Sequence, residues 1–276
     1  MPSPQIPSPS WRCIIAFVLI LAHANPLTSA APLSKRQSGI VEMAADPVVI
    51  DPKGIYIRAS PLQTDGGIIA GYAATEGSEK VLRVAQSTDN AQSWSYVGEV
   101  TRADDSTRDL DNAMPLQLAS GRIVYAFRNH DRTGPETYSY YRITMSYSDD
   151  GGKSWSFLSQ VAEREANIQP GQKNGLWEPF LRVARDGSLQ VYYSSENNDD
   201  DQDNLMRYST DGGLTWNDDV MVSGWDQKKA RDGMTGVADV DGKGRLMWVS
   251  FFPSLCWREN PEQELTKDTA VSSNPW

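Results

Sequence analysis

A short box of eight residues occurs three times in the chain, as Ser87–Trp94, Ser148–Trp155 and Ser209–Trp216. The shared pattern is S-x-D-x-G-x-[ST]-W, and its single departure is Ala91 in the first box. The boxes begin at residues 87, 148 and 209, so the two intervals between them are equal at 61 residues. A unit that returns at a fixed interval of this length indicates a repeat architecture, such as a propeller or a solenoid.

Each box lies between two apolar runs, so we expect it to form the turn of a hairpin. In such a turn the Asp carboxylate can accept hydrogen bonds from backbone amides, and the Gly can adopt a positive φ. The Trp side chain then packs back against the sheet as a large apolar plug. We therefore interpret the box as turn chemistry and packing, not as a catalytic motif.

The residues before each box predict three further strands. In the third unit, a strand around Phe180 leads through a turn at Asp186-Gly187 to strands at Leu189–Tyr193 and Leu205–Tyr208, and the box follows. Strand, tight turn, strand, loop, strand, box and strand together make a four-stranded propeller blade. No stretch beyond the N-terminal leader has the 3.6-residue apolar periodicity of a helix. A solenoid would need shorter repeats. The sequence therefore predicts an all-β fold, a β-propeller of four-stranded blades.

A fourth unit begins at Gly233–Val237 and continues with Leu246–Val249, but no fourth box follows it. At this period the chain carries about three and a half blades, and an incomplete propeller leaves an unpaired strand edge. The codons of Val249-Ser250 can match the consensus start of an intron. We hypothesise that the tail 250–276 is translated intron outside the repeat domain. The alternative is a genuine short protein with a disordered tail.

The N-terminus has the pattern of a secretion signal. Arg12 precedes the apolar run Cys13–Ala22, which is too short to span a bilayer, and small residues follow it. We predict a secreted, extracellular protein with a signal peptide over 1–30, a pro-segment that ends at residue 36 and an incomplete propeller over 37–249.

Composition narrows the classes of function. A net charge of -10 argues against nucleic acid and anionic membranes as partners. Cys13 and Cys256 cannot staple the core, and His130, the single histidine after the leader, cannot form a zinc cluster. A Ser-His-Asp triad on His130 has no supporting motif around it. We expect no cofactor and no metal, and carboxylates as the agents of any chemistry.

Three stretches precede the first strand of successive units, at 108–115, 174–180 and 230–234, where they would line the central depression of a propeller. Glu178 is the sharpest candidate among them. Its apolar neighbours, Trp177 above all, would shield the carboxyl from water and favour the protonated form that a general acid needs. The alternative is a structural Glu paired with a neighbouring Arg.

Further side chains near the same rim could hold a substrate. Arginine can bind a hydroxyl or a carboxylate, although arginines in blades also pair internally. The predicted substrate-binding residues are Arg58, Asp111, Asn112, Trp177, Glu196, Asn197, Arg231 and Asp232. The acidic loop 199–203 could bind calcium, but we favour a solvated loop.

The box is similar to the Asp-box of the sialidase-like, or BNR-repeat, superfamily. Over about residues 45–249 the chain resembles fungal secreted enzymes of glycoside hydrolase family 93. The motifs that carry this resemblance are Asp109–Asn112, Ala126–His130, Tyr141–Ile143, Leu176–Pro179, Tyr193–Asn197, Asp203–Leu205 and Arg231–Met234. It implies a six-bladed propeller that releases arabinobiose from the non-reducing ends of linear α-1,5-arabinan with retention, using two glutamates.

The resemblance assigns Glu178 as the catalytic acid/base. It places the second glutamate one blade later, after Leu246–Val249, where this sequence has Ser250-Phe251-Phe252. Because a retaining mechanism needs a carboxylate nucleophile about 5–5.5 Å from the acid, this departure puts the activity of the chain as written in doubt.

We therefore predict a secreted, monomeric glycosidase of the arabinanase type, with a polysaccharide or oligosaccharide substrate. One alternative is a sialidase, which would need an arginine triad and a Tyr–Glu pair, and of these Arg58 alone is visible. The other alternative is a non-catalytic sugar-binding propeller that uses Trp177, Tyr192 and Tyr193 as stacking platforms.

Overall fold

The computed structural model describes residues 47–64, 66–239, 246–251 and 256–260. The predicted signal peptide, the pro-segment and most of the tail lie outside the described residues. All regular elements in the described ranges are β-strands, and none of these ranges contains a helix long and apolar enough to cross a membrane.

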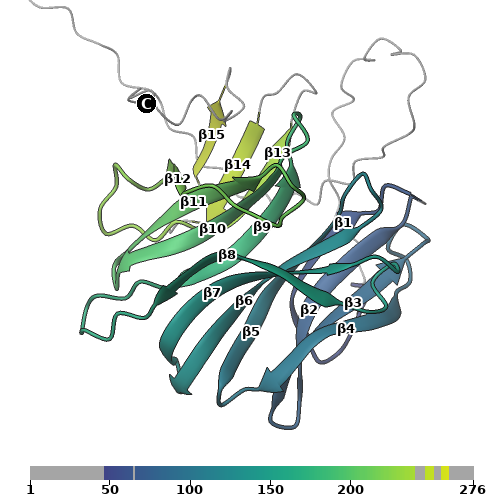
Figure 1. Ribbon diagram of the computed structural model, residues 1–276, viewed down its shortest axis with the longest axis horizontal. Helices are drawn as coiled ribbons and strands as arrows, with labels where there is room; N and C mark the ends of the chain where they lie inside the picture. The colour runs from purple at the N-terminus through teal and green to yellow at the C-terminus, as the bar shows by residue number, and fades with distance from the viewer. Residues whose placement is uncertain (1–46, 65, 240–245, 252–255, 261–276) are drawn as a thin grey trace, which may run out of the picture.

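The strands form successive antiparallel sheets, which Figure 1 shows arranged in an arc. Blade 1 consists of β1 (Gly54–Pro61), β2 (Ile68–Glu76), β3 (Glu79–Ser87) and β4 (Ser95–Asp104). Blade 2 consists of β5 (Arg108–Gln117), β6 (Ile123–Gly134), β7 (Thr137–Ser148) and β8 (Ser156–Glu165). Blade 3 consists of β9 (Leu176–Val183), β10 (Leu189–Asn198), β11 (Asp201–Ser209) and β12 (Val220–Ser223). Consecutive strands are neighbours in each sheet, as predicted for a propeller of four-stranded blades.

Blade 4 contains β13 (Gly233–Asp239), β14 (Leu246–Phe251) and β15 (Cys256–Asn260) among the described residues. The sequence predicted no strand after Val249, yet the backbone of β15 pairs antiparallel with β14. The prediction missed β15 because its residues show no alternation of apolar and polar side chains.

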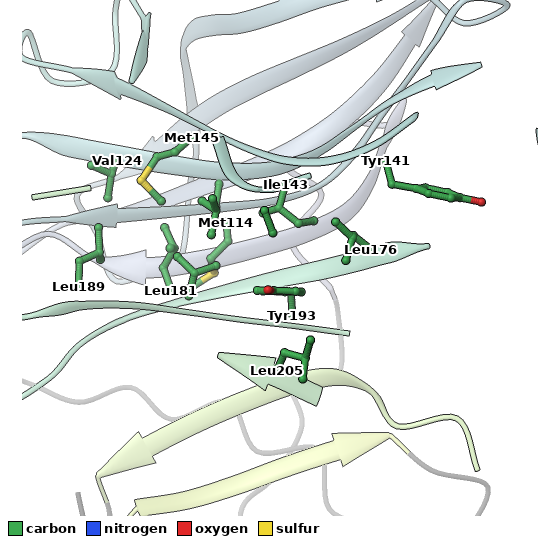
Figure 2. Close-up of a cluster of buried hydrophobic side chains, with 14 residues drawn as sticks. Met114, Val124, Tyr141, Ile143, Met145, Leu176, Leu181, Leu189, Tyr193 and Leu205 are labelled. Carbon is green, nitrogen blue, oxygen red and sulfur yellow. The ribbon is translucent and has the colours of Figure 1, made fainter. Parts of the chain in front are cut away.

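The hydrophobic core lies between neighbouring blades. One cluster of buried side chains joins blade 2 to blade 3, and Figure 2 shows Met114, Ile143 and Tyr193 among its members. A second cluster, around Leu82 and Tyr125, joins blade 1 to blade 2. Strands buried on both faces are apolar along their length and do not alternate. This burial explains the continuous apolar runs that marked β2, β6 and β10 in the sequence.

Each box forms the turn between the third and fourth strands of its blade. In the second box, Oδ1 of Asp150 accepts hydrogen bonds from the amides of Lys153 and Ser154 at 3.0 Å, and Oδ2 accepts from the Ser154 hydroxyl at 2.6 Å. The bonds from Ser154 hold the pKa of Asp150 well below its ordinary value. Gly152 has a φ of 93°, so the predicted turn chemistry is confirmed.

The boxes also join one blade to the next. The hydroxyl of Ser159 in β8 donates to the carbonyl oxygen of Gly213 at 2.6 Å, and Nε1 of Trp216 donates to the same hydroxyl at 3.0 Å. One blade earlier, Gly98 in β4 takes the place of Ser159, and a Cβ there would lie 2.4 Å from the carbonyl oxygen of Gly152. Each of these boxes therefore packs on the outer strand of the preceding blade.

Candidate active site

A bulge recurs in the first strand of every blade. These strands, β1, β5, β9 and β13, contact one another in chain order, and each shows a register shift against its second strand. Each shift holds a residue other than glycine at positive φ: Tyr56 (51°), Asn112 (52°), Glu178 (57°) and Met234 (51°). Such a conformation costs about 1–3 kcal/mol and is concentrated at functional sites, while bulges redirect side chains. We therefore infer that a functional site lies along β1, β5, β9 and β13, which we call the inner strands.

Glu178 occupies the bulge of β9, and its side chain reaches blade 4. Its Oε2 accepts a hydrogen bond from the amide of Met234 at 2.5 Å. Pro179 follows in the bulge, where a residue without an N–H is tolerated because no ladder bond is lost. The carboxylate is partly buried, and its second oxygen, Oε1, has no hydrogen bond to any residue that the structure describes. An anchored carboxyl with one unengaged oxygen can exchange a proton with a ligand.

Trp177 lies on the opposite side of β9 from this anchor. Its ring packs edge-on against His130 and Tyr141 of blade 2, with centroids 5.0 and 5.9 Å apart. Arg128 stacks over the same ring at 5.1 Å. Trp177 therefore packs between blades, and its predicted role in substrate binding remains a prediction.

Arg58, in β1, faces the site from blade 1. Its Nη1 donates to the carbonyl oxygen of Pro179 at 2.6 Å. Burial lowers the pKa of Arg58, although the charges of Glu178 and Asp111 oppose this effect. Those two carboxylates are thus close enough to act electrostatically on one guanidinium, and the sequence-predicted residues Arg58, Asp111 and Glu178 gather at the inner strands.

Asp111 flanks the bulge of β5 and Asn112 lies within it, and both are buried. Oδ1 of Asp111 accepts from the amide of Asn112 at 2.7 Å, and Oδ2 lies 3.4 Å from Arg128. Burial raises the pKa of Asp111 despite the charge of Arg128. Oδ1 of Asn112 is buried without a hydrogen-bond partner among the described residues. A buried polar atom of this kind is a plausible ligand contact, because leaving it unpaired is costly.

Glu196 and Arg231 pair with each other at the junction of blades 3 and 4. Arg231 donates to Oε1 of Glu196 at 2.6 Å, while Oε2 of Glu196 accepts from the amide of Gly175 at 3.0 Å. Asp232 accepts from the hydroxyl of Ser223 at 2.6 Å. These predicted substrate contacts are engaged within the protein, and they tie the starts of β9 and β13 together.

The side chain of Asn197 binds two carboxylates of the segment that we predicted to be a solvated acidic loop. Its Nδ2 donates to Asp201 and Asp203 at 2.9 and 2.8 Å. The prediction of a solvated loop was wrong for these residues, because β11 begins at Asp201 and both carboxylates are buried. No group of three or more His, Cys, Asp or Glu side chains in the described part of the chain could hold a metal ion.

The structure argues against two alternatives raised by the sequence, namely sugar stacking on Tyr192 and Tyr193 and a catalytic triad on His130. Tyr192 and Tyr193 are 2 % and 0 % exposed, so they cannot serve as stacking platforms for a sugar. The imidazole of His130 is fully buried, and its Nδ1 accepts a hydrogen bond from the amide of Arg142 at 3.1 Å. That bond uses the nitrogen that a triad carboxylate would need.

The sequence analysis did not predict two contacts that shape the site. The amide of Met234 carries no side-chain signal, and it lies 56 residues from Glu178. Gln202 packs beside Gly233, where a Cβ would lie 3.1 Å from both Gln202 Nε2 and Glu178 Oε2. The four bulge residues share no residue type, so the recurrence of the bulge has no sequence signature, although Asn112 and Glu178 were predicted as site residues on other grounds.

The comparisons with known proteins agree with this architecture. A family model described as BNR repeat-like domain matches residues 63–249. A sialidase of Paraclostridium sordellii is 28 % identical in an alignment 183 residues long, and the match covers 58 % of this chain and 45 % of the sialidase.

Solved structures show the same fold. The GH93 α-L-arabinofuranosidase of Fusarium graminearum, in complex with arabinobiose, superposes with a TM-score of 0.59 at 23 % identity, over 73 % of this chain and 57 % of that one. The α-L-arabinanase of Penicillium chrysogenum, also with arabinobiose, gives a TM-score of 0.59 at 21 % identity, over 76 % and 64 %. The chain thus spans less than two thirds of the length of each of these relatives.

Proposed function

Because the chain belongs to the BNR repeat-like domain family, we propose that it serves carbohydrate hydrolysis, as the propeller part of a secreted, monomeric glycoside hydrolase. The proposed substrate is linear α-1,5-L-arabinan, attacked from its chain ends with retention. The solved arabinofuranosidase and arabinanase complexes with arabinobiose support this substrate class.

The position of Glu178 carries the proposal. It stands in a strained bulge on an inner strand, its Oε2 is anchored by the Met234 amide, and Arg58 lies next to it on the carbonyl oxygen of Pro179. In the proposed reaction Glu178 protonates the oxygen of the leaving sugar and later takes a proton from the attacking water. Arg58 and the buried Asp111 and Asn112 would orient the sugar.

Retention also requires a carboxylate nucleophile about 5–5.5 Å from the acid. The end of β14, one blade after Glu178, carries Ser250-Phe251 in the sequence and no glutamate. We therefore leave the nucleophile unassigned. Retaining hydrolysis by this chain therefore requires another of its carboxylates as the nucleophile, and without one the chain would bind the sugar and release no product.

The first experiment measures arabinobiose release from linear arabinan and arabinobiose binding by calorimetry, on the full chain and on Glu178→Gln. If Glu178 is the acid/base, the substitution lowers kcat by about 10²–10⁴-fold and leaves the Kd for arabinobiose within about threefold. Glu136→Gln is the matched control, because Glu136 is also a glutamate at positive φ but lies in an exposed hairpin turn. An unchanged rate in Glu178→Gln would assign the acid elsewhere.

A second candidate is a non-catalytic carbohydrate-binding propeller, and the absence of a glutamate at Ser250-Phe251 favours it. Binding of arabinobiose with no release of product by the wild-type chain would establish this candidate. A third candidate, a sialidase, rests on the similarity to the Paraclostridium sordellii protein. Release of sialic acid from a sialoside, with none of arabinobiose from arabinan, would establish that alternative.

A further inference from the structure

Gln202, at the start of β11, binds the segment that leads into β13 through both its backbone and its side chain. Its amide donates to the carbonyl oxygen of Ala230 at 2.8 Å, and its carbonyl oxygen accepts from the amide of Asp232 at 2.9 Å. Its Nε2 donates to the carbonyl oxygen of Asp232 at 2.5 Å. The side chain is buried, so these bonds are shielded from competing water. One glutamine thus fixes the backbone over 230–232.

Arg231 binds the side chains of both Gln202 and Glu196. Its Nη2 donates to Oε1 of Gln202 at 3.1 Å and to Oε1 of Glu196 at 2.6 Å, and these two acceptors oppose each other across β10 and β11. Glu196 in turn accepts from the amide of Gly175, which lies just before β9. Because Arg231 binds Oε1 of the Gln202 side-chain amide, Nε2 of Gln202 is directed at the backbone of blade 4.

The backbone that Gln202 fixes leads directly to the anchor of Glu178. Gly233 follows Asp232, and it lies so close to both side chains that a Cβ there would be 3.1 Å from Gln202 Nε2 and from Glu178 Oε2. The next residue, Met234, adopts a φ of 51° and turns its amide toward Oε2. The direction of this N–H depends on the backbone immediately before it.

We propose that Gln202 is a positioning residue for Glu178. By holding the Asp232 carbonyl it sets the Met234 amide against Glu178 Oε2, so that Oε1 is the oxygen that carries the exchangeable proton. An oxygen that accepts an N–H is best unprotonated, so the proton of the acid form belongs on the other oxygen. The inference rests on the proposed catalytic role of Glu178, but the geometry that it describes can be tested without turnover.

The test compares Gln202→Leu with the wild-type full chain by nuclear magnetic resonance of the Met234 amide. In the wild type, the proton shift of this amide should follow the titration of Glu178, and Glu178→Gln should abolish that response. In Gln202→Leu the response should fall by at least about half, and amide exchange should rise about tenfold, as expected when one hydrogen bond is lost. Gln190→Leu is the matched control, because Gln190 is a buried glutamine of the same blade that bonds Arg182 and Tyr192.

Turnover provides the second readout, because a positioning residue should change kcat and not KM. Gln202→Leu should lower kcat about tenfold with KM unchanged, and Gln190→Leu should leave both unchanged. An unaltered Met234 titration in Gln202→Leu would overturn the positioning role, whatever the rates. A lost titration in a chain that releases no arabinobiose would support the positioning role and reject the proposed hydrolysis.

Discussion

Arg58 of blade 1 donates from Nη1 to the carbonyl oxygen of Pro179 of blade 3 at 2.6 Å, and so joins two blades that blade 2 separates in the sequence. The accepting residue directly follows Glu178, which is held on its other side by the Met234 amide. The bulge of β9 is therefore fixed from both directions, by a side chain of blade 1 and by the backbone of blade 4.

Replacement of Arg58 by Gln should destabilise the fold and weaken turnover together. A hydrogen bond from a charged donor contributes about 1.5–3 kcal/mol, and its loss leaves a carbonyl oxygen unsatisfied next to the site. Urea unfolding should show a loss of stability in this range, and kcat should fall.

The control for this change is Arg122→Gln. Arg122 forms an exposed ion pair with Asp149 at 2.7 Å, so its replacement should change stability by less than about 1 kcal/mol. Equal losses of stability in the two variants would show that the bond from Arg58 to Pro179 contributes no more than an exposed ion pair.

Ala91→Gly should stabilise the protein. Ala91 stands at the glycine position of the first box and has a φ of 66°, where the other boxes have Gly152 and Gly213 at 93° and 96°. A left-handed conformation costs a residue with a Cβ about 1–2 kcal/mol, and glycine avoids that cost. Thermal or urea unfolding should show a gain of about 1 kcal/mol.

Gly152→Ala, in the second box, is the reciprocal experiment. A Cβ at Gly152 would meet its nearest atom at 3.5 Å, an ordinary contact, so the substitution tests the backbone conformation without a clash. It should destabilise by about 1 kcal/mol. If both changes were neutral, the boxes would tolerate either residue, and strain at Ala91 would be excluded.

The sequence predicted the blades well because the box is a local device. Asp150 and Gly152 act on amides and φ angles within their own turn, so their pattern can be recognised without the rest of the fold. The site was only partly predictable. Trp177 is adjacent to Glu178 in the sequence, yet it packs on blade 2 while Glu178 reaches blade 4. Contacts such as that between Gln202 and Gly233 depend on how two blades meet, and no local pattern encodes them.

The protein should lose stability as the pH falls below about 6.5. His130 is buried against the rings of Tyr138, Tyr141 and Trp177. Burial, with the charges of Arg128 and Arg142, holds the pKa of His130 well below its ordinary value, although Asp109 acts in the opposite direction. Between the two pKa values the unfolded chain binds a proton that the folded chain excludes. The free energy of unfolding should then fall by up to about 1.4 kcal/mol per pH unit.

His130→Gln separates this histidine from other titrating groups. A glutamine can still accept a hydrogen bond from the Arg142 amide but does not titrate. Urea unfolding at pH 5.5 and pH 7.5 should show a smaller difference in the variant than in the wild type, and His23 is common to both proteins. The same difference in both proteins would mean that His130 does not set the acid response.

Gly233→Ala should impair turnover more than stability. The new Cβ would lie 3.1 Å from Glu178 Oε2, and the mobile end of that side chain can move away more easily than the backbone. The carboxylate would then leave the Met234 amide, and a misplaced acid costs about tenfold or more in kcat. Gly236→Ala, on the same strand, is the matched control because its Cβ would meet nothing within 4 Å. If both variants kept full activity and the same unfolding midpoint, the position of Glu178 would not depend on the close approach of β13, and the anchor at Met234 would be dispensable.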